Sequence, residues 1–189
     1  VFNTAALERL GVTGDTPCPA GGVIGQACGV PTGYMEENAF LEFQKQVPMM
    51  PLETFLGAYR KAQDLYASHG ITTVQEGLLR RELVPLYQAL LADGPLKLDV
   101  VAYGDEAGTA AARQAFPDSA RRYQGHFRLG GYKMFLDGSP QGRTAWLRQP
   151  YQGETAYRGY GTLTDAQVLG MVRRAGAEGM QLLAHCNGD

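Results

Sequence analysis

The feature that most constrains the fold is a regular alternation of helical and strand-like segments that begins at Pro51. Apolar residues recur at helical spacing from Leu52 to Tyr66, and Gly70 is a typical helix stop. The run Ile71–Glu76 follows and is rich in β-branched residues, as expected of a strand. The same order then repeats, which predicts helices over residues 82–92, 106–115 and 164–177 and strands over residues 96–104, 132–136 and 180–185. Residues 123–129 are expected to form a connecting segment.

An alternation of this kind predicts an α/β fold with a parallel sheet and right-handed crossovers, either in a barrel or in an open doubly wound sheet. In both architectures ligands bind at the C-terminal ends of the strands. Polar residues occur at the ends of four successive predicted strands, namely Glu76, Tyr103, Asp137 and His185. If these strand ends share one rim, the residues form a candidate site.

The first fifty residues have a different character from the rest. A short helical patch covers residues 4–10, and a segment dense in glycine and proline follows. Short apolar runs between these turn residues indicate small hairpins or an irregular excursion. We therefore expect residues 1–50 to form an irregular insertion with a short helix and hairpins, and residues 51–189 to form the α/β segment.

Composition narrows the classes of partner. The 189 residues carry a net charge of −2 and have a pI near 5.9, with no basic run, so nucleic acid is not an expected partner. No apolar stretch is long enough to span a bilayer, so no membrane partner is expected. The cysteines Cys18, Cys28 and Cys186 are odd in number and form no CxxC pair, which favours a reducing compartment, although a Cys18–Cys28 disulfide remains open. We therefore expect a cytoplasmic protein. Neither end reads as a natural terminus, so we also expect a piece of a longer chain.

Lys133 is unusual because it lies within an otherwise apolar strand. Alternation puts Lys133, Phe135 and Asp137 on one face of that strand. A lysine that extends to water and a structural histidine at position 185 are the simplest explanations. Two chemical explanations remain open: a Lys133 carboxylated by carbon dioxide could bridge divalent metals with His185 as a nitrogen ligand, or an unmodified Lys133 could form a Schiff base with a carbonyl substrate.

Several segments together resemble a known family. GGYKMFLDGSPQGRTAWLRQPY at residues 130–151 and GMQLLAHCNGD at residues 179–189 are similar to the metal-dependent amidohydrolase superfamily, and within it to the YtcJ-like group, amidohydrolase family 3. GITTVQEG at residues 70–77 and the two segments at residues 2–12 and 29–40 fit the same group. The resemblance covers essentially the whole chain.

The resemblance implies a (β/α)8 TIM-type barrel, of which this chain would supply about strands two to five with their helices, preceded by the family insertion. It implies hydrolysis of amide or other non-peptide C–N bonds of a small molecule by a metal-bound hydroxide. Lys133 matches the lysine that is carboxylated in many superfamily members, and His185 matches a metal-binding histidine. One or two divalent ions are implied, with Zn²⁺ as the default. The expected substrate contacts are Asp137, Ser139, Arg143 and Glu76; for the loop residues the alternative is a structural turn and a salt-bridging tether.

The chain departs from the family in its ligand set. The first-strand HxH pair is absent, and the histidines are His69, His126 and His185. With two of about six ligands, the segment is expected to bind metal weakly and not to turn over substrate. Two other functions remain open: a Schiff-base aldolase or lyase barrel that uses Lys133, and a non-catalytic half-barrel that self-associates through open sheet edges and an exposed apolar face.

Overall fold

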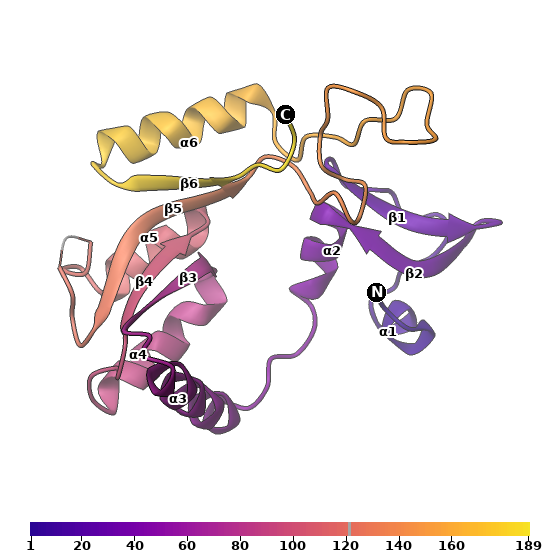
Figure 1. The fold of residues 1–189 in the computed structure, drawn as a ribbon. Helices are drawn as coiled ribbons and strands as arrows, with labels where there is room; N and C mark the ends of the chain where they lie inside the picture. Colours follow the sequence, from indigo (N-terminus) through magenta and orange to yellow (C-terminus); the bar gives the residue numbers. More distant parts are fainter. Residues whose placement is uncertain (121) are drawn as a thin grey trace. The chain divides into compact units, whose positions relative to one another are not determined.

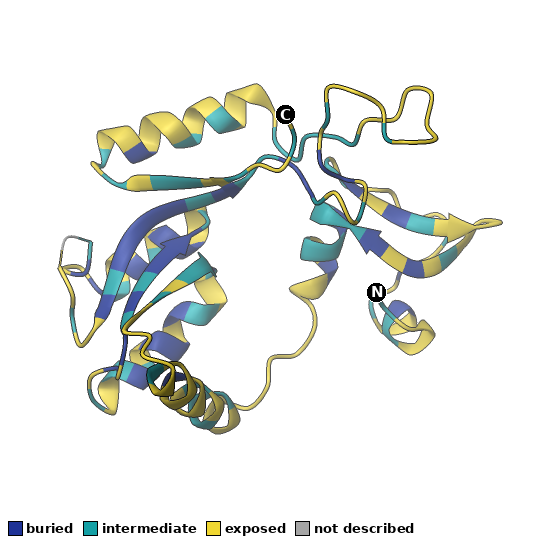
Figure 2. Ribbon diagram, in the orientation of Figure 1, coloured by how far each residue is buried: buried dark blue, intermediate teal, exposed yellow. Residues whose placement is uncertain are grey.

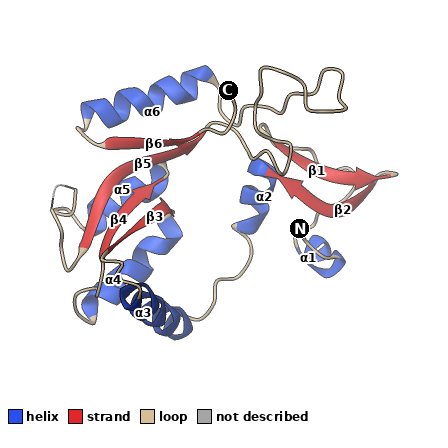
Figure 3. Ribbon diagram, viewed as in Figure 1, coloured by secondary structure: helices blue, strands red, loops and turns tan. Residues whose placement is uncertain are grey.

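The computed structural model describes residues 1–120 and 122–189 and divides into two compact units. The first unit contains Val1–Met49, Phe135–Asp165 and His185–Asp189, and the second contains Met50–Met134 and Ala166–Ala184. Figure 1 labels the helices and strands of both units, and Figure 3 colours them by type. These units do not test the predicted domain boundary at residue 50, which stays a prediction.

A four-stranded sheet forms the centre of the second unit, in the order β3-β4-β5-β6. Its strands are β3 (Thr73–Leu79), β4 (Asp99–Gly104), β5 (Phe127–Phe135) and β6 (Gln181–His185). The β3–β4 and β4–β5 pairs are parallel, and Figure 1 shows β6 running in the same direction as β5. The predicted α/β class with a parallel sheet is therefore confirmed.

Helices connect these strands, as the alternation predicted. They are α3 (Leu52–Ser68), a 3₁₀ turn η1 (Arg81–Leu83) that leads into α4 (Val84–Ala92), α5 (Glu106–Ala115) and α6 (Asp165–Ala177). Asp105 caps α5, because its carboxylate accepts a hydrogen bond of 2.6 Å from the backbone amide of Gly108. None of the described helices is long and apolar enough to cross a lipid bilayer.

One face of the sheet is buried against α4 and α5. Val100 and Ala102, two residues apart on β4, both belong to this core, as the period of a strand requires. The fully buried ring of Phe127 lies between two aromatic rings, with centroids 5.0 Å from Tyr87 and 4.8 Å from Phe116. Figure 2 shows that burial is concentrated along β4 and β5. These strands hold the second unit together.

The start of β5 differs from the sequence prediction. The sequence predicts a connecting segment at residues 123–129 and a strand at residues 132–136. This boundary is wrong, because β5 begins at Phe127 and runs through Gly130 and Gly131. The glycine pair does not break the strand. A Cβ on Gly130 would lie 2.6 Å from the Tyr103 ring, and a Cβ on Gly131 would lie 2.0 Å from the Gln181 carbonyl oxygen. These glycines instead allow the neighbouring strands to pack closely.

The first unit begins with α1 (Thr4–Arg9), which Asn3 caps by accepting a hydrogen bond from the Ala6 amide at 2.9 Å. An antiparallel hairpin of β1 (Gly22–Ala27) and β2 (Val30–Glu36) follows, and α2 (Glu37–Gln44) comes directly after it. Buried apolar side chains from these elements form a separate small core, comprising Leu7, Val12, Ile24, Met35, Ala39 and Phe43. The region thus contains more regular structure than its glycine and proline content indicated, and α2 in particular was not predicted.

Candidate functional site

Asp137 connects the loop after β5 to the loop after β6. Its side chain is only 3% exposed, and its carboxylate accepts three backbone hydrogen bonds. The donors are the amides of Trp146 at 2.9 Å, Asn187 at 2.9 Å and Gly188 at 2.6 Å. A buried carboxylate requires such partners, so these bonds explain why an aspartate is tolerated there. The bonds assign Asp137 a structural role, and its contact with substrate stays a prediction.

His185 is held at the end of β6 by a ring contact, a backbone hydrogen bond and polar contacts of Nε2. The ring packs against Phe135 with centroids 5.4 Å apart, and the His185 carbonyl accepts a hydrogen bond from the Leu136 amide at 2.9 Å. Nε2 lies 2.9 Å from Nδ2 of Asn187 and 3.3 Å from the Gly138 carbonyl oxygen. The same Asn187 amide donates to Gly138 at 2.8 Å. His185, Asn187 and Gly138 therefore form one polar cluster.

Ser139 and Arg143 lie in the loop after β5 and contact residues of the first unit. The Ser139 amide donates to the Thr144 hydroxyl at 2.9 Å. The Arg143 guanidinium pairs with Glu154 at 2.7 Å and lies 5.4 Å from the ring centre of Tyr151. Arg143 also has a backbone φ of +57°, a conformation that is uncommon outside glycine. These contacts agree with a tether, and the substrate-binding roles of Ser139 and Arg143 stay predictions.

Lys133 is half-buried in β5. Its neighbours Tyr132 and Met134 are buried, and the Tyr132 hydroxyl donates to Glu178, just beyond α6, at 2.7 Å. Because side chains alternate along a strand, Lys133 projects from the sheet face opposite to Tyr132. Lys133 belongs to the second unit and His185 to the first, so their membership of one metal site stays a prediction.

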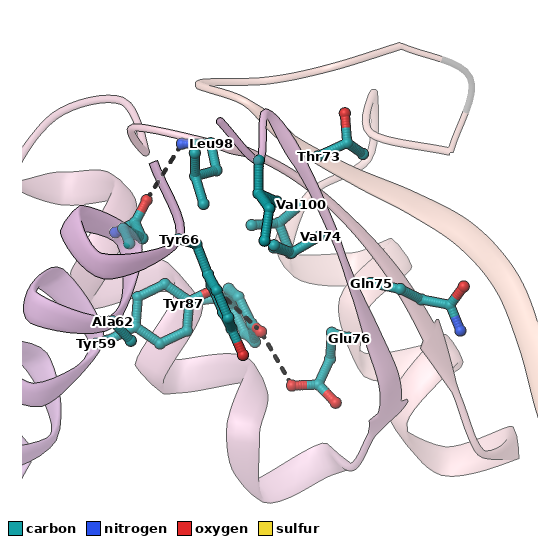
Figure 4. Close-up of a pocket in the computed structure, with 12 residues that line it drawn as sticks. Tyr59, Ala62, Tyr66, Thr73, Val74, Gln75, Glu76, Tyr87, Leu98 and Val100 are labelled. Carbon is teal, nitrogen blue, oxygen red and sulfur yellow. Dashed lines mark hydrogen bonds between the residues drawn. The ribbon is translucent and has the colours of Figure 1, made fainter. Parts of the chain in front are cut away.

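Glu76 lies on the helix-covered face of the sheet, the face opposite to Lys133. In the β3–β4 register Glu76 is the partner of Ala102, which belongs to the core under the helices. Its carboxylate accepts hydrogen bonds from the Tyr87 hydroxyl at 3.1 Å and from the Leu78 amide at 3.0 Å (Figure 4). The structure therefore does not bring Glu76 and Lys133 together.

Three polar residues of the first unit were not identified from the sequence. Thr144 is only 1% exposed, and its hydroxyl donates to Glu37 at 2.6 Å. Glu37 has a φ of +45° at the start of α2, a strained conformation for a glutamate. Asn187 contacts His185 as described above. The Glu36-Glu37 pair ahead of a helix does not indicate a partner 107 residues away. The HxN spacing at the end of β6 was a signal for the contact between Asn187 and His185, two residues apart.

Glu36 is also paired, because it accepts a hydrogen bond from the Tyr160 hydroxyl at 2.9 Å. Burial, reinforced by Glu36, raises the pKa of Tyr160 above its ordinary value. Tyr160 therefore remains a neutral hydrogen-bond donor at physiological pH. Together with the Thr144–Glu37 bond, this pair attaches the start of α2 to the long loop that follows β5.

The described residues do not form a metal centre by themselves. No group of three His, Cys, Asp or Glu side chains with suitable positions occurs within residues 1–120 and 122–189. The Nε2 atom of His185 is directed at the Asn187 amide and the Gly138 carbonyl, so an ion bound through Nε2 would have to replace one of these contacts. A complete centre requires ligands beyond those that this cluster presents.

Comparisons with known proteins identify the family. YtcJ of Bacillus subtilis (strain 168), whose name assigns it to the amidohydrolases, is 27% identical over 203 residues, covering 99% of this chain and 36% of that protein. Two crystal structures of uncharacterized metal-dependent hydrolases share the fold over the whole chain: one from Pyrococcus horikoshii OT3 (TM-score 0.70, 23% identity, 37% of that chain) and one from Pyrococcus furiosus (TM-score 0.72, 21% identity, 38% of that chain). The chain thus spans somewhat more than a third of the length of these relatives. The model described as "Amidohydrolase family" matches residues 1–189, so this chain belongs to the amidohydrolase family.

Proposed function

We propose that this chain is a segment of a metal-dependent hydrolase that cleaves amide-type C–N bonds, other than peptide bonds, in small molecules. Membership of the amidohydrolase family over the full chain supports the reaction class. The shared fold with two metal-dependent hydrolases supports an arrangement in which the four-stranded sheet is part of a (β/α)8 barrel, about strands two to five.

The observation that carries the proposal is the arrangement around Asp137. Asp137 follows β5, Asn187 follows β6, and the buried carboxylate of the first accepts the backbone amide of the second at 2.9 Å. The loops at the C-terminal ends of two adjacent strands are therefore held together, and this is the end of a parallel barrel at which active sites form. His185 lies at the same strand end, with its ring held by Phe135.

Within this proposal, Lys133 and His185 are two ligands of a divalent ion, Zn²⁺ by default, and the longer protein supplies the others. The bound ion would supply a Lewis acid and an activated water. Asp137 keeps the two loops in register, and Ser139 and Arg143 shape the substrate pocket. This segment on its own binds metal weakly and is inactive.

The test is an activity assay on the longer protein that contains this segment. Hydrolysis of a panel of small N-acyl amides should be lost after treatment with a chelator and restored by Zn²⁺. Activity that persists without divalent metal would contradict the proposal. Borohydride trapping of a carbonyl compound on Lys133 separates the alternative, because a Schiff-base enzyme would be inactivated by this treatment whereas a hydrolase would not.

A further inference from the structure

A cavity of about 400 Å³ lies between α3 and the edge strand β3, on the helix-covered face of the sheet. This volume falls within the usual range for small-molecule sites. Figure 4 shows aromatic rings from α3 and α4 close to the carboxylate of Glu76. All of the lining residues belong to the second unit, whereas Asp137 and His185 belong to the first.

The aromatic part of the lining consists of Tyr59, Tyr66 and Tyr87. Tyr59 and Tyr87 meet edge to face with ring centroids 5.8 Å apart, and Tyr87 is only 2% exposed, so their positions are fixed by packing. Tyr66 is 47% exposed and lies where a ligand can reach it. Rings of this kind present a negative face to a bound cation.

Glu76 supplies the charge. Its carboxylate is half-buried at the cavity wall, and the Tyr87 hydroxyl and the Leu78 amide orient it through hydrogen bonds of 3.1 and 3.0 Å. Burial, reinforced by Tyr59 and Glu76, raises the pKa of Tyr87 above its ordinary value, so this hydroxyl stays protonated and keeps donating to Glu76.

No lysine, arginine or histidine occurs among the twelve residues described as lining the cavity, so nothing in this wall neutralises Glu76. A fixed carboxylate beside the accessible rings of Tyr59 and Tyr66 is complementary to a positively charged organic group and unfavourable for an anion. We propose that this cavity is a binding site for a small organic cation, in which Glu76 pairs with the ammonium group, the rings of Tyr59 and Tyr66 lie against it, and the buried Tyr87 holds Glu76 in place.

The site is independent of the proposed hydrolase function, because Glu76 and Lys133 lie on opposite faces of the sheet. The experiment therefore measures binding and not activity. The probes are benzylamine, benzyl alcohol and benzoate, which share a ring and differ in charge. Each is titrated into the isotope-labelled chain at a concentration at which light scattering gives the mass of the monomer, and backbone amide shifts are followed by NMR. Benzylamine should shift the amides of residues 73–76, while benzyl alcohol binds about tenfold more weakly and benzoate does not bind.

Two pairs of variants test the residues. Glu76→Gln keeps the size of the side chain and an acceptor for Tyr87 but removes the charge, and it should weaken benzylamine binding about tenfold. Its matched control is Glu82→Gln, at an exposed position of η1 outside the cavity wall, which should bind as the unmodified chain does. Tyr66→Leu should weaken binding severalfold, and Tyr66→Phe should restore it.

The amide spectrum of each variant also reports whether it is folded, so a loss of binding is counted only for a folded variant. Three results would overturn the proposal. They are equal affinity for the three probes, unchanged benzylamine affinity in a folded Glu76→Gln variant, and no shift in residues 73–76 at about 10 mM benzylamine, the range of the weakest specific binding.

Discussion

The carboxylate of Asp137 accepts a hydrogen bond of 2.6 Å from the backbone amide of Gly188, 51 residues further along the chain. Gly188 is required at this point, because a Cβ there would lie 1.9 Å from the Trp146 carbonyl oxygen. Trp146 itself donates its amide to Asp137. The loops after β5 and β6 are thus one structure with a buried carboxylate at its centre, and the position of His185 depends on it.

Replacing Asp137 with asparagine should destabilise this structure. The side-chain NH2 group of the asparagine is a donor, and it would face at least one of the backbone amides that now donate to the carboxylate. That buried backbone amide would then have no acceptor. We expect the free energy of unfolding to fall by about 2 kcal/mol in urea denaturation. Asp15→Asn, at an exposed position of the same unit, should show no measurable change. Equal stability of the two variants would contradict the structural role of Asp137.

Gly131→Ala should be strongly destabilising, because the added methyl would lie 2.0 Å from the Gln181 carbonyl oxygen on β6. We expect a loss of about 3 kcal/mol in thermal or urea unfolding. Gly170→Ala provides the contrast, since no atom outside the adjoining backbone of α6 lies within 4 Å of a Cβ at this position. Alanine is the better helix former, so this variant should be more stable by about 0.5–1 kcal/mol. Opposite signs for the two substitutions are the expected outcome, and similar effects would argue against the close approach of β5 and β6.

Stability should fall at alkaline pH through buried tyrosines. Burial, reinforced by Glu178, raises the pKa of Tyr132 from 10.0 to about 12. The unfolded chain loses this proton near pH 10 while the folded chain keeps it, so the contribution of Tyr132 is complete below pH 10 and is lost as the pH rises through about 12. Unfolding free energies measured from pH 9 to 12 should decline less steeply in Tyr132→Phe. Tyr123→Phe, at an exposed position, should follow the unmodified chain.

We also propose that the isolated chain self-associates. β3 is an edge of the described sheet, and Thr73 and Gln75 on it are exposed. Unpaired edge strands favour pairing with a second copy. Light scattering after size-exclusion chromatography should give a mass above 20.5 kDa that decreases with dilution, and Gln75→Lys should shift the population toward monomer because charge on an edge opposes pairing. A monodisperse monomer at high concentration would exclude this.

The periodic parts of the fold were predictable from the sequence. The alternation after Pro51 predicted α3 to β6 in the correct order, because helical spacing and β-branched runs directly reflect which face each element buries. The boundary of β5 was not predictable, since Gly130-Gly131 signals a turn locally and only the positions of Tyr103 and Gln181 on neighbouring strands show that the glycines serve close packing. The helix α2 was hidden by the turn-rich residues that precede it.

For the candidate site, the sequence indicated polar residues at strand ends but not the contacts that they make. Asp137 and His185 were recognised at strand ends, but no local pattern indicated that the Asp137 carboxylate accepts hydrogen bonds from three backbone amides. Glu76 was assigned to the same rim because it ends a strand-like run, and alternation along β3 puts its side chain on the helix-covered face instead. The Thr144–Glu37 bond joins residues 107 positions apart, a distance at which local sequence patterns carry no information.

The most direct test of the account is the metal content of the longer protein that contains this segment, measured by elemental analysis. His185→Ala and Lys133→Ala should each lower the bound divalent metal relative to the unmodified protein. His126→Ala and Lys97→Ala are matched controls, because their side chains are exposed and pair with Asp99 and Asp64 respectively. We expect loss of metal in the first pair of variants and full occupancy in the second. Unchanged metal content in both His185→Ala and Lys133→Ala would contradict it.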